Sequence, residues 1–375
     1  MKYVNIKMLL VFCLTVTLIF SVCAQKPTLK NAFDGQFYIG AALNEWQIVG
    51  NDVSAISLVK AHFNSISPEN CFKWERIHPQ QNKYRFELPD SFVAFGEKNR
   101  MFIIGHCMVW HSQVPKWVFI DSLGNQLSRD ALLKRMHDHI LTVMGRYKGR
   151  IKGYDVVNEA LNDNGTMRQS KWLKIIGEDY IEKAFEYAKE ADPNAELYYN
   201  DFNIEQPSKR EGAIKLIKSL QAKGIKISGV GIQGHYHLNR PSLKDIDESI
   251  DEFSKLGIKV MFTELDVNVL PSPKNFNGAD VSQDFEMDKT LNPYPKGLPD
   301  SVQTQLAKRY ADFFKIFVKY KGKVTRITFW GVDDAQSWLN NWPVRGRTNY
   351  PLIFDRKCMP KPAFFSILEC AKSSQ

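Results

Sequence analysis

The chain has 375 residues, of which 44% are hydrophobic and 24% are charged, and its formal net charge is +9. A chain of this length can bury a large core, and an α/β barrel routinely uses a similar length as one domain. The lysines are dispersed without a basic block or a nucleic-acid-reading motif, so we expect no nucleic-acid partner.

Residues 1–24 have the features of a secretory signal peptide. Two lysines precede an apolar run over 8–20, and a small-residue exit follows it. The run is shorter than the roughly 20 apolar residues of a membrane span, and no other stretch approaches that length. We therefore expect cleavage near Ala24, which lowers the net charge from +9 to +7, and an exported chain, secreted or periplasmic, without a membrane span. Lipid attachment at Cys23 is the alternative, although the bulky Val22 before it fits poorly.

Short apolar segments rich in β-branched or aromatic residues predict eight strands. In chain order they cover residues 38–43, 64–69, 102–110, 153–159, 196–202, 229–234, 260–267 and 326–332.

Longer segments with apolar residues three and four positions apart predict helices between the strands. They cover residues 131–146, 173–190, 209–223, 243–256 and 302–320. Gly224 and Gly257 stand where two of these helices should end. The alternation predicts an α/β protein with a single-domain (β/α)8 TIM barrel over residues 25–375, with a doubly wound sheet as the alternative. The Pro- and Asn-rich segment 268–300 is expected to form a long loop after the seventh strand.

The carboxyl ends of the predicted strands carry polar or aromatic side chains, and the active site of a TIM barrel lies at those ends. These residues are Glu69, Asn70, His106, Trp110, His111, Asn158, Glu159, Asn200, Asp201, Gln233, His235, Glu264, Asp266 and Trp330. One such residue could simply pack against a loop, but the whole set indicates a functional site.

Glu159 and Glu264 both close apolar strands, where burial favours the neutral form of a carboxyl group. Glycoside hydrolysis needs two carboxyl groups, one protonated beside the leaving oxygen and one ionised to attack the sugar. Asp266 shares a strand face with Glu264, and a histidine between these two acids, His235, would keep Glu264 ionised. Glu159 has no such partner nearby in sequence, so we expect its pKa to be raised. The pattern predicts Glu264 as nucleophile and Glu159 as acid/base.

The motifs around these residues resemble those of the endo-β-1,4-xylanases of glycoside hydrolase family 10. The matching blocks are SPENCFKW, GHCMVWHSQVP, YDVVNEA, YYNDFN, GVGIQGH, TELDV, FWGVDDAQSW, PLIFD and PKPAF. The resemblance extends from about Asn31 to Ala371 and implies a retaining mechanism with the same two glutamates in the same roles.

The resemblance also implies roles for the other site residues. Asn158 would hold the 2-hydroxyl of the reacting sugar. The ligands of the non-reducing (glycone) side would be Glu69, Asn70 and Lys73. The cleavage position would be lined by His106, Trp110 and Gln233. The stacking pair would be Trp330 and Trp338, and the supporting residues would be Asn200, His235 and Asp266.

Xylan and xylo-oligosaccharides are the substrates that the resemblance implies, cut internally in an open groove. Gln113 and Trp338 would crowd the position of the glucose C5 hydroxymethyl group, which disfavours cellulose by repulsion. A β-1,4-glucanase or a mixed-specificity barrel glycosidase is an alternative. A carbohydrate-binding protein with a dead site is another, but it would not need both glutamates together with His235 and Asp266.

The sequence departs from the family pattern at Tyr154, Phe202 and Leu339, where Trp, Tyr and Arg are common. The last two departures leave the affinity of the outer sugar sites open.

Four cysteines lie beyond the signal segment, and their spacing is not that of a metal site: Cys71, Cys107, Cys358 and Cys370. We expect buried free thiols, with a Cys71–Cys107 disulfide as the alternative. We also expect no metal, no cofactor and a monomeric protein.

Overall fold

The fold is a closed barrel of parallel strands, seen in a computed structural model that describes residues 27–276 and 280–372. The barrel strands are β1 (Tyr38–Leu43), β2 (Ser65–Pro68), β3 (Phe102–Trp110), β4 (Gly153–Asn158), β5 (Glu196–Asp201), β6 (Gly229–Ile232), β8 (Lys259–Asn268) and β9 (Val324–Phe329). Each pairs with its neighbour in parallel, β6 pairs with β8, and β9 closes the circle on β1. The predicted TIM barrel is confirmed, and the doubly wound alternative is wrong.

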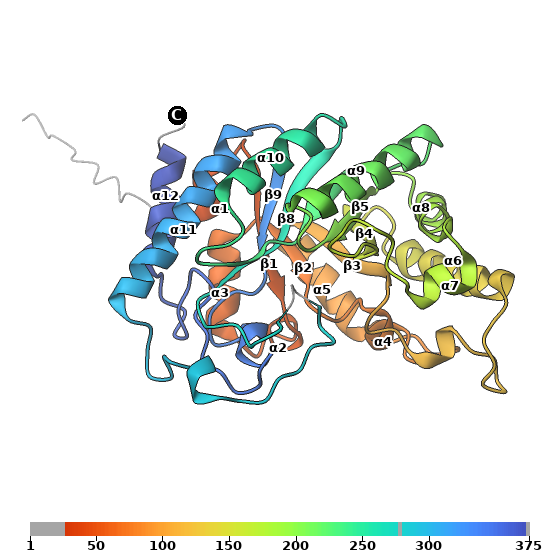
Figure 1. The fold of residues 1–375 in the computed structure, drawn as a ribbon, viewed down its shortest axis with the longest axis horizontal. Coiled ribbons are helices and arrows are strands. Elements are labelled where there is room, and N and C mark those ends of the chain that lie inside the picture. Colours follow the sequence, from red (N-terminus) through yellow and green to blue (C-terminus); the bar gives the residue numbers. More distant parts are fainter. Residues whose placement is uncertain (1–26, 277–279, 373–375) are drawn as a thin grey trace, which may run out of the picture.

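Helices surround the barrel and cover its outer face (Figure 1). The longer helices are α3 (Val53–His62), α5 (Glu87–Lys98), α6 (Arg129–Arg146), α8 (Tyr180–Ala191), α9 (Pro207–Ala222), α10 (Leu243–Ser254), α11 (Asp300–Lys319) and α12 (Pro362–Lys372). The shorter ones are α1 (Leu29–Ala32), α2 (Glu45–Ile48), α4 (Trp74–Ile77) and α7 (Lys171–Ile176), with 3-10 turns at Lys116–Val118, Lys289–Leu291 and Trp338–Asn340.

The structure differs from the predicted elements in three places. The helix expected over 173–190 is divided into α7 and α8, because Gly177 adopts a φ of 106° that interrupts the helix. Helices α3, α5 and α12 were not predicted. α5 contains Pro89 and Gly96, both poor helix formers, and its stability comes from packing that a propensity argument does not see.

The third difference is a short extra strand, β7 (His235–His237), which pairs with the carboxyl end of β8. No strand was predicted at these residues. The predicted sixth strand covered residues 229–234, whereas β6 stops at Ile232 and Gly234 turns the chain with a φ of 83°. This turn places His235 opposite Asp266.

The expected long loop after the seventh barrel strand is present, between β8 and α11. The predicted signal segment lies outside the described residues. Cys71 and Cys107 are buried free thiols, so the disulfide alternative is wrong. Within the described part of the chain, no helix is long and apolar enough to cross a membrane.

A buried ion pair joins the C-terminal segment to the loop after β9. The Nζ atom of Lys361 donates to Asp334 Oδ2 at 2.8 Å and to the backbone oxygens of Tyr350 and Leu352 at 2.8 and 2.7 Å. Burial raises the pKa of Asp334 to about 6, against the opposing effect of the Lys361 charge. The pair therefore has all of its donors satisfied, which is the condition under which a buried ammonium is tolerated.

Lys361→Met should destabilise the protein by about 3–5 kcal/mol, because it leaves Asp334 as an unpaired buried carboxylate. The free energy of unfolding in urea measures this. Lys357→Met, at an exposed position four residues earlier, is the control and should change stability by less than about 0.5 kcal/mol. Equal effects of the two substitutions on the free energy of unfolding would contradict the role of Lys361 as the partner of a buried carboxylate.

Candidate active site

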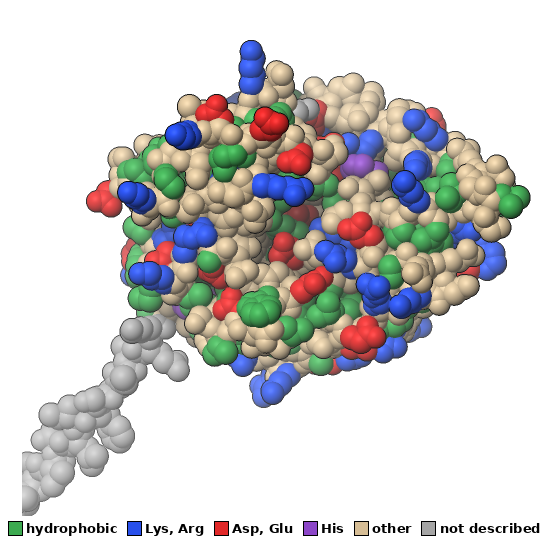
Figure 2. Space-filling model, turned by 90° about the horizontal axis from the view of Figure 1, so that it is seen from below, with side chains coloured by type: hydrophobic (Ala, Val, Ile, Leu, Met, Phe, Trp, Pro, Cys, Tyr) green, Lys and Arg blue, Asp and Glu red, His purple; other side chains and the backbone are tan. Residues whose placement is uncertain are grey.

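A cavity of about 290 Å³ opens at the carboxyl ends of the barrel strands. Figure 2 shows this face of the molecule hollowed near its centre, with acidic side chains gathered in and around the hollow. Thirteen of the fifteen residues to which the family resemblance gives a role line the cavity: Glu69, Asn70, Lys73, His106, Trp110, Gln113, Asn158, Glu159, Gln233, His235, Glu264, Trp330 and Trp338. The other two, Asn200 and Asp266, lie directly behind it, bonded to residues of the lining.

Three lining residues were not predicted: Ser112, Val281 and Trp342. Trp342 stacks on Trp338 with ring centroids 4.4 Å apart and an interplanar angle of 12°. An aromatic residue four positions after a predicted stacking tryptophan was a usable signal, whereas nothing in the sequence of the long loop distinguishes Val281.

Strand register brings the central amides together. Trp110 is the register partner of Asn158, and Asn158 is the partner of Asn200, so β3, β4 and β5 present these residues at one level. Asn200 donates from Nδ2 to Asn158 Oδ1 at 2.9 Å and to Glu264 Oε1 at 2.8 Å. Asn200 therefore links β4, the strand that precedes Glu159, to the side chain of Glu264.

Asn200 requires a glycine on the neighbouring strand. A Cβ atom at Gly231 would lie 2.2 Å from Asn200 Oδ1, which is closer than real Cβ contacts allow. The hydroxyl of Thr263 donates to the same oxygen at 2.6 Å and completes the seat of this amide.

Glu159 has a left-handed backbone, with a φ of 55°. A residue with a long side chain occupies this region at a cost, so the surrounding structure must impose it. Two hydrogen bonds do so: Glu159 N donates to Asn200 O at 2.9 Å, and Arg168 Nε donates to Glu159 O at 3.1 Å. The turn directs the carboxyl group from the strand end into the cavity.

The carboxyl group of Glu159 is buried and accepts hydrogen bonds from neutral donors. Trp110 Nε1 lies 2.8 Å from Oε2, and Gln233 Nε2 lies 2.9 Å from Oε1. Burial raises the pKa of Glu159, the negative charge of Glu264 raises it further, and the two hydrogen bonds compensate only in part. The expected upward shift is confirmed, and the sequence argument missed these donors because they come from other strands.

The carboxyl group of Glu264 has the opposite tendency. Burial alone would raise its pKa, but the hydrogen bond from His235, the charges of His106 and His235 and the amide of Asn200 together hold the pKa below its usual value. His235 Nε2 lies 3.2 Å from Glu264 Oε2. The pKa of Glu264 is therefore lowered in the same cavity in which the pKa of Glu159 is raised.

His235 lies between two acids, as predicted. Its Nδ1 atom lies 3.1 Å from Asp266 Oδ1, opposite the contact to Glu264. Burial would lower the pKa of His235, but Asp266 and Glu264 raise it to about 10. The ring is therefore an imidazolium at neutral pH.

The predicted sugar ligands Glu69, Asn70 and Lys73 lie on the side of the cavity that follows β2. Lys73 Nζ donates to Asn70 Oδ1 at 3.0 Å and lies 5.1 Å from the centre of the Trp110 ring. Burial raises the pKa of Glu69, and Lys73 opposes this shift. On the opposite side, Trp338 Nε1 donates to Asp266 Oδ2 at 2.8 Å, which fixes the ring plane.

A sequence model of Glycosyl hydrolase family 10 matches residues 28–370. The chain belongs to this family. Endo-1,4-beta-xylanase A of Xylanibacter ruminicola is 48% identical over 360 residues, which cover 96% of this chain and 98% of that protein. Beta-1,4-xylanase of Dictyoglomus thermophilum is 43% identical, with 92% and 91% covered.

Solved structures agree with this family 10 assignment. A family 10 endoxylanase retrieved from a sugarcane soil metagenome has a TM-score of 0.89 at 46% identity, covering 91% of this chain and 99% of the other. A glutamate-to-alanine mutant in complex with xylotriose has a TM-score of 0.82 at 36% identity, covering 92% and 100%.

Two departures from the family 10 pattern lie away from the cavity surface. Phe202 is buried, with the ammonium of Lys209 3.7 Å from its ring centre. Leu339 is also buried. Neither of these side chains lines the catalytic cavity.

The long loop between β8 and α11 contacts the side of the site on which Glu159 lies. Arg168 Nη1 lies 3.2 Å from Asp280 Oδ2, so one guanidinium joins this loop to the backbone of Glu159. Within the described residues, no group of His, Cys, Asp and Glu side chains is arranged to hold a metal ion.

His235→Leu should move the acidic limb of the pH profile of kcat/KM upward by about 1–3 pH units, because a nearby positive charge lowers a carboxyl pKa by that amount. The limb reports protonation of Glu264, whose pKa rises when its donor is removed. The measurement is hydrolysis of an activated aryl glycoside between pH 3 and pH 9. His237→Leu, on the same strand but bonded to Arg240, is the control. An unmoved acidic limb would show that His235 does not set the ionisation of Glu264.

Proposed function

We propose that this protein is an endo-1,4-β-xylanase that hydrolyses internal β-1,4-xylosidic bonds of xylan with retention of configuration. The observation that carries the proposal is the pair of glutamates buried in one cavity, with Glu159 bonded to a neutral indole and a neutral amide and Glu264 bonded to the imidazole of His235. Relatives of this chain that are named as xylanases support xylan as the substrate. The xylotriose complex of a relative supports xylo-oligosaccharides as ligands.

In the first half of the reaction, the ionised Glu264 attacks the anomeric carbon while the protonated Glu159 gives its proton to the leaving oxygen. The bond between sugar and leaving group breaks, and a glycosyl ester of Glu264 forms. Asn158, held by Asn200 and Gln233, is the amide that contacts the 2-hydroxyl of the sugar. That contact strengthens as charge develops on the sugar ring.

In the second half, the negative charge of Glu264 is consumed in the ester. This charge is one of the causes of the raised pKa of Glu159, so the pKa of Glu159 falls. The now ionised Glu159 takes a proton from water, which attacks the anomeric carbon and releases the sugar. His235 stabilises the carboxylate of Glu264 as the leaving group.

The walls of the cavity support a preference for xylose over glucose. Gln113 and Trp338 both line the cavity, and each is fixed by a hydrogen bond, to Glu75 at 3.2 Å and to Asp266 at 2.8 Å. A wall that cannot move aside discriminates against an added hydroxymethyl group by repulsion. We expect this repulsion to make kcat/KM about 10- to 200-fold higher on xylose-based than on glucose-based substrates.

We further propose that the protein is exported, secreted or periplasmic, and acts as a monomer. The basic and apolar pattern of residues 1–24 supports export, since it is typical of a signal peptide.

The purified protein should release soluble sugar from dyed xylan at least about 10-fold faster than from dyed carboxymethylcellulose. Early products from linear xylan should be mixed oligomers. Xylose alone from the first minutes would contradict internal cleavage, and equal rates on both polymers would contradict the proposed substrate.

Glu159→Ala should lower kcat on xylan by about 10²–10⁴-fold, because the leaving oxygen loses its proton donor. Azide should restore the activity of this variant on an aryl xylobioside with a good leaving group and yield a β-xylobiosyl azide, identified by NMR. Glu264→Ala is the matched variant, and azide should yield no β-configured product with it. A β-azide from Glu264→Ala instead would reverse the two roles.

A further inference from the structure

Trp342 packs against the wall residue Trp338 and has no role in the reaction proposed above. The two indole rings are stacked, with centroids 4.4 Å apart and an interplanar angle of 12°. Both side chains line the catalytic cavity, and both come from the segment that follows β9. One face of Trp338 is therefore covered by protein, so a sugar can meet only the other face or the edge of this ring.

A wall discriminates by repulsion only if it does not give way. A side chain that turned aside would admit an added hydroxymethyl group at little cost, and the preference for xylose would be lost. The hydrogen bond from Trp338 Nε1 to Asp266 Oδ2, at 2.8 Å, holds one edge of the ring. Hydrogen bonds tolerate a range of angles, so this bond alone permits the ring to tilt. The stacked ring of Trp342 opposes a tilt toward it.

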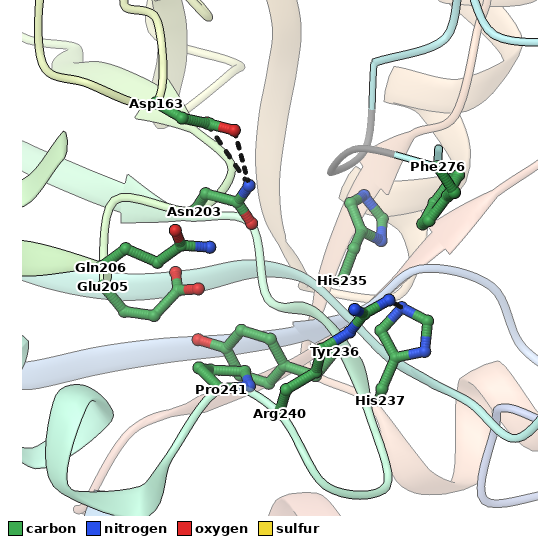
Figure 3. Close-up of a pocket in the computed structure, with 10 residues that line it drawn as sticks. All are labelled: Asp163, Asn203, Glu205, Gln206, His235, Tyr236, His237, Arg240, Pro241 and Phe276. Carbon is green, nitrogen blue, oxygen red and sulfur yellow. Dashed lines mark hydrogen bonds between the residues drawn. The ribbon is translucent and has the colours of Figure 1, made fainter. Parts of the chain in front are cut away.

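Trp342 is itself held between two loops. Its ring lies edge to face with that of Phe276 in the long loop, with centroids 5.4 Å apart and an interplanar angle of 63°. The buried Arg347 donates from Nη2 to Trp342 O at 3.0 Å and from Nη1 to Pro271 O at 3.3 Å. Figure 3 shows Phe276 beside His235, at one side of a smaller pocket that adjoins the catalytic cavity. The support behind Trp338 therefore includes the long loop after β8.

Trp342 contributes its ring to this arrangement and not its N–H group. Its Nε1 atom is buried and has no hydrogen-bond partner among the described residues. The contacts with Trp338 and Phe276 are contacts between rings. Another aromatic ring could make them, whereas an aliphatic side chain could not.

The other contacts of Trp338 are shared with the proposed nucleophile. Asp266 accepts a hydrogen bond from Trp338 and also contacts His235, whose ring centroid lies 4.8 Å from that of Trp338. His235 in turn contacts Glu264. A substitution at Asp266 or His235 would therefore alter the wall and the nucleophile together. Trp342 supports the wall from outside this charged group.

We propose that Trp342 is a positioning residue that determines specificity, because it holds Trp338 in the place where the C5 hydroxymethyl group of glucose would lie. The inference rests on the proposed function, since it takes the exclusion of that group as the task of Trp338. Trp342 acts through Trp338 and makes no contact with the reacting bond.

The test compares kcat/KM on an aryl xylobioside and an aryl cellobioside. Trp342→Ala should lower the ratio of the first value to the second by about 2- to 10-fold, the factor that corresponds to the stacking energy of an aromatic pair. The value of kcat on the aryl xylobioside should stay within about 2-fold of that of the unmodified protein, because the interactions made in the transition state are kept.

Two further substitutions at the same position separate the ring from its bulk. Trp342→Phe keeps a ring that can stack and should keep the ratio within about 2-fold. Trp342→Leu keeps apolar bulk without a ring face, so it should lower the ratio as Trp342→Ala does, and it keeps the test valid if Trp342→Ala does not fold. Phe365→Ala, at a position on α12 that is 54% exposed, is the matched control and should leave the ratio unchanged. Melting temperatures check that all variants are folded.

Three outcomes would overturn the proposal. An unchanged ratio in both Trp342→Ala and Trp342→Leu would mean that Trp338 is held without Trp342. An equal loss of kcat/KM on both substrates would mean that Trp342 binds the sugar or supports the whole site. A ratio lowered as much by Trp342→Phe as by Trp342→Ala would mean that stacking is not its contribution. Failure of the proposed function looks different, because the unmodified protein would then cleave neither substrate or both equally well.

Discussion

The proposed reaction requires two carboxyl groups buried in one cavity to hold different protonation states, and the partners of these two groups differ accordingly. Burial raises the pKa of both, so the difference comes from their partners. Glu159 receives hydrogen bonds from an indole and an amide, which are neutral. Glu264 receives one from an imidazolium that a further acid, Asp266, keeps charged. One added charge thus separates the proposed proton donor from the proposed nucleophile.

The closed parallel barrel makes this arrangement possible, because it aligns residues that are far apart in the sequence. Asn158 and Asn200 meet through strand register, and Gly231 leaves the space that the second amide needs. The added strand β7 brings His235 opposite Asp266 instead of leaving it at the end of β6. The positions of these side chains therefore depend on the strand register of the closed barrel.

The barrel and both glutamates could be predicted because strand patterns and strand-end acids are local signals. The trio of His235, Glu264 and Asp266 was also predictable, since two of its members share one strand face. The donors to Glu159 were not, because Trp110 and Gln233 reach it from other strands. The burial of Phe202 and Leu339 could not be predicted either, because a motif gives a residue's position in the chain but not its exposure.

The guanidinium of Arg168 contacts both the backbone of Glu159, the proposed acid/base residue, and the loop after β8. Loops usually tolerate insertions and deletions, because they run over the protein surface. This loop is in addition tied to the backbone of Glu159 through Arg168. An insertion or deletion that displaced Asp280 would also alter the charge environment of the arginine that supports Glu159. Divergence of this loop among descendants of the protein is therefore constrained by catalysis as well as by substrate shape.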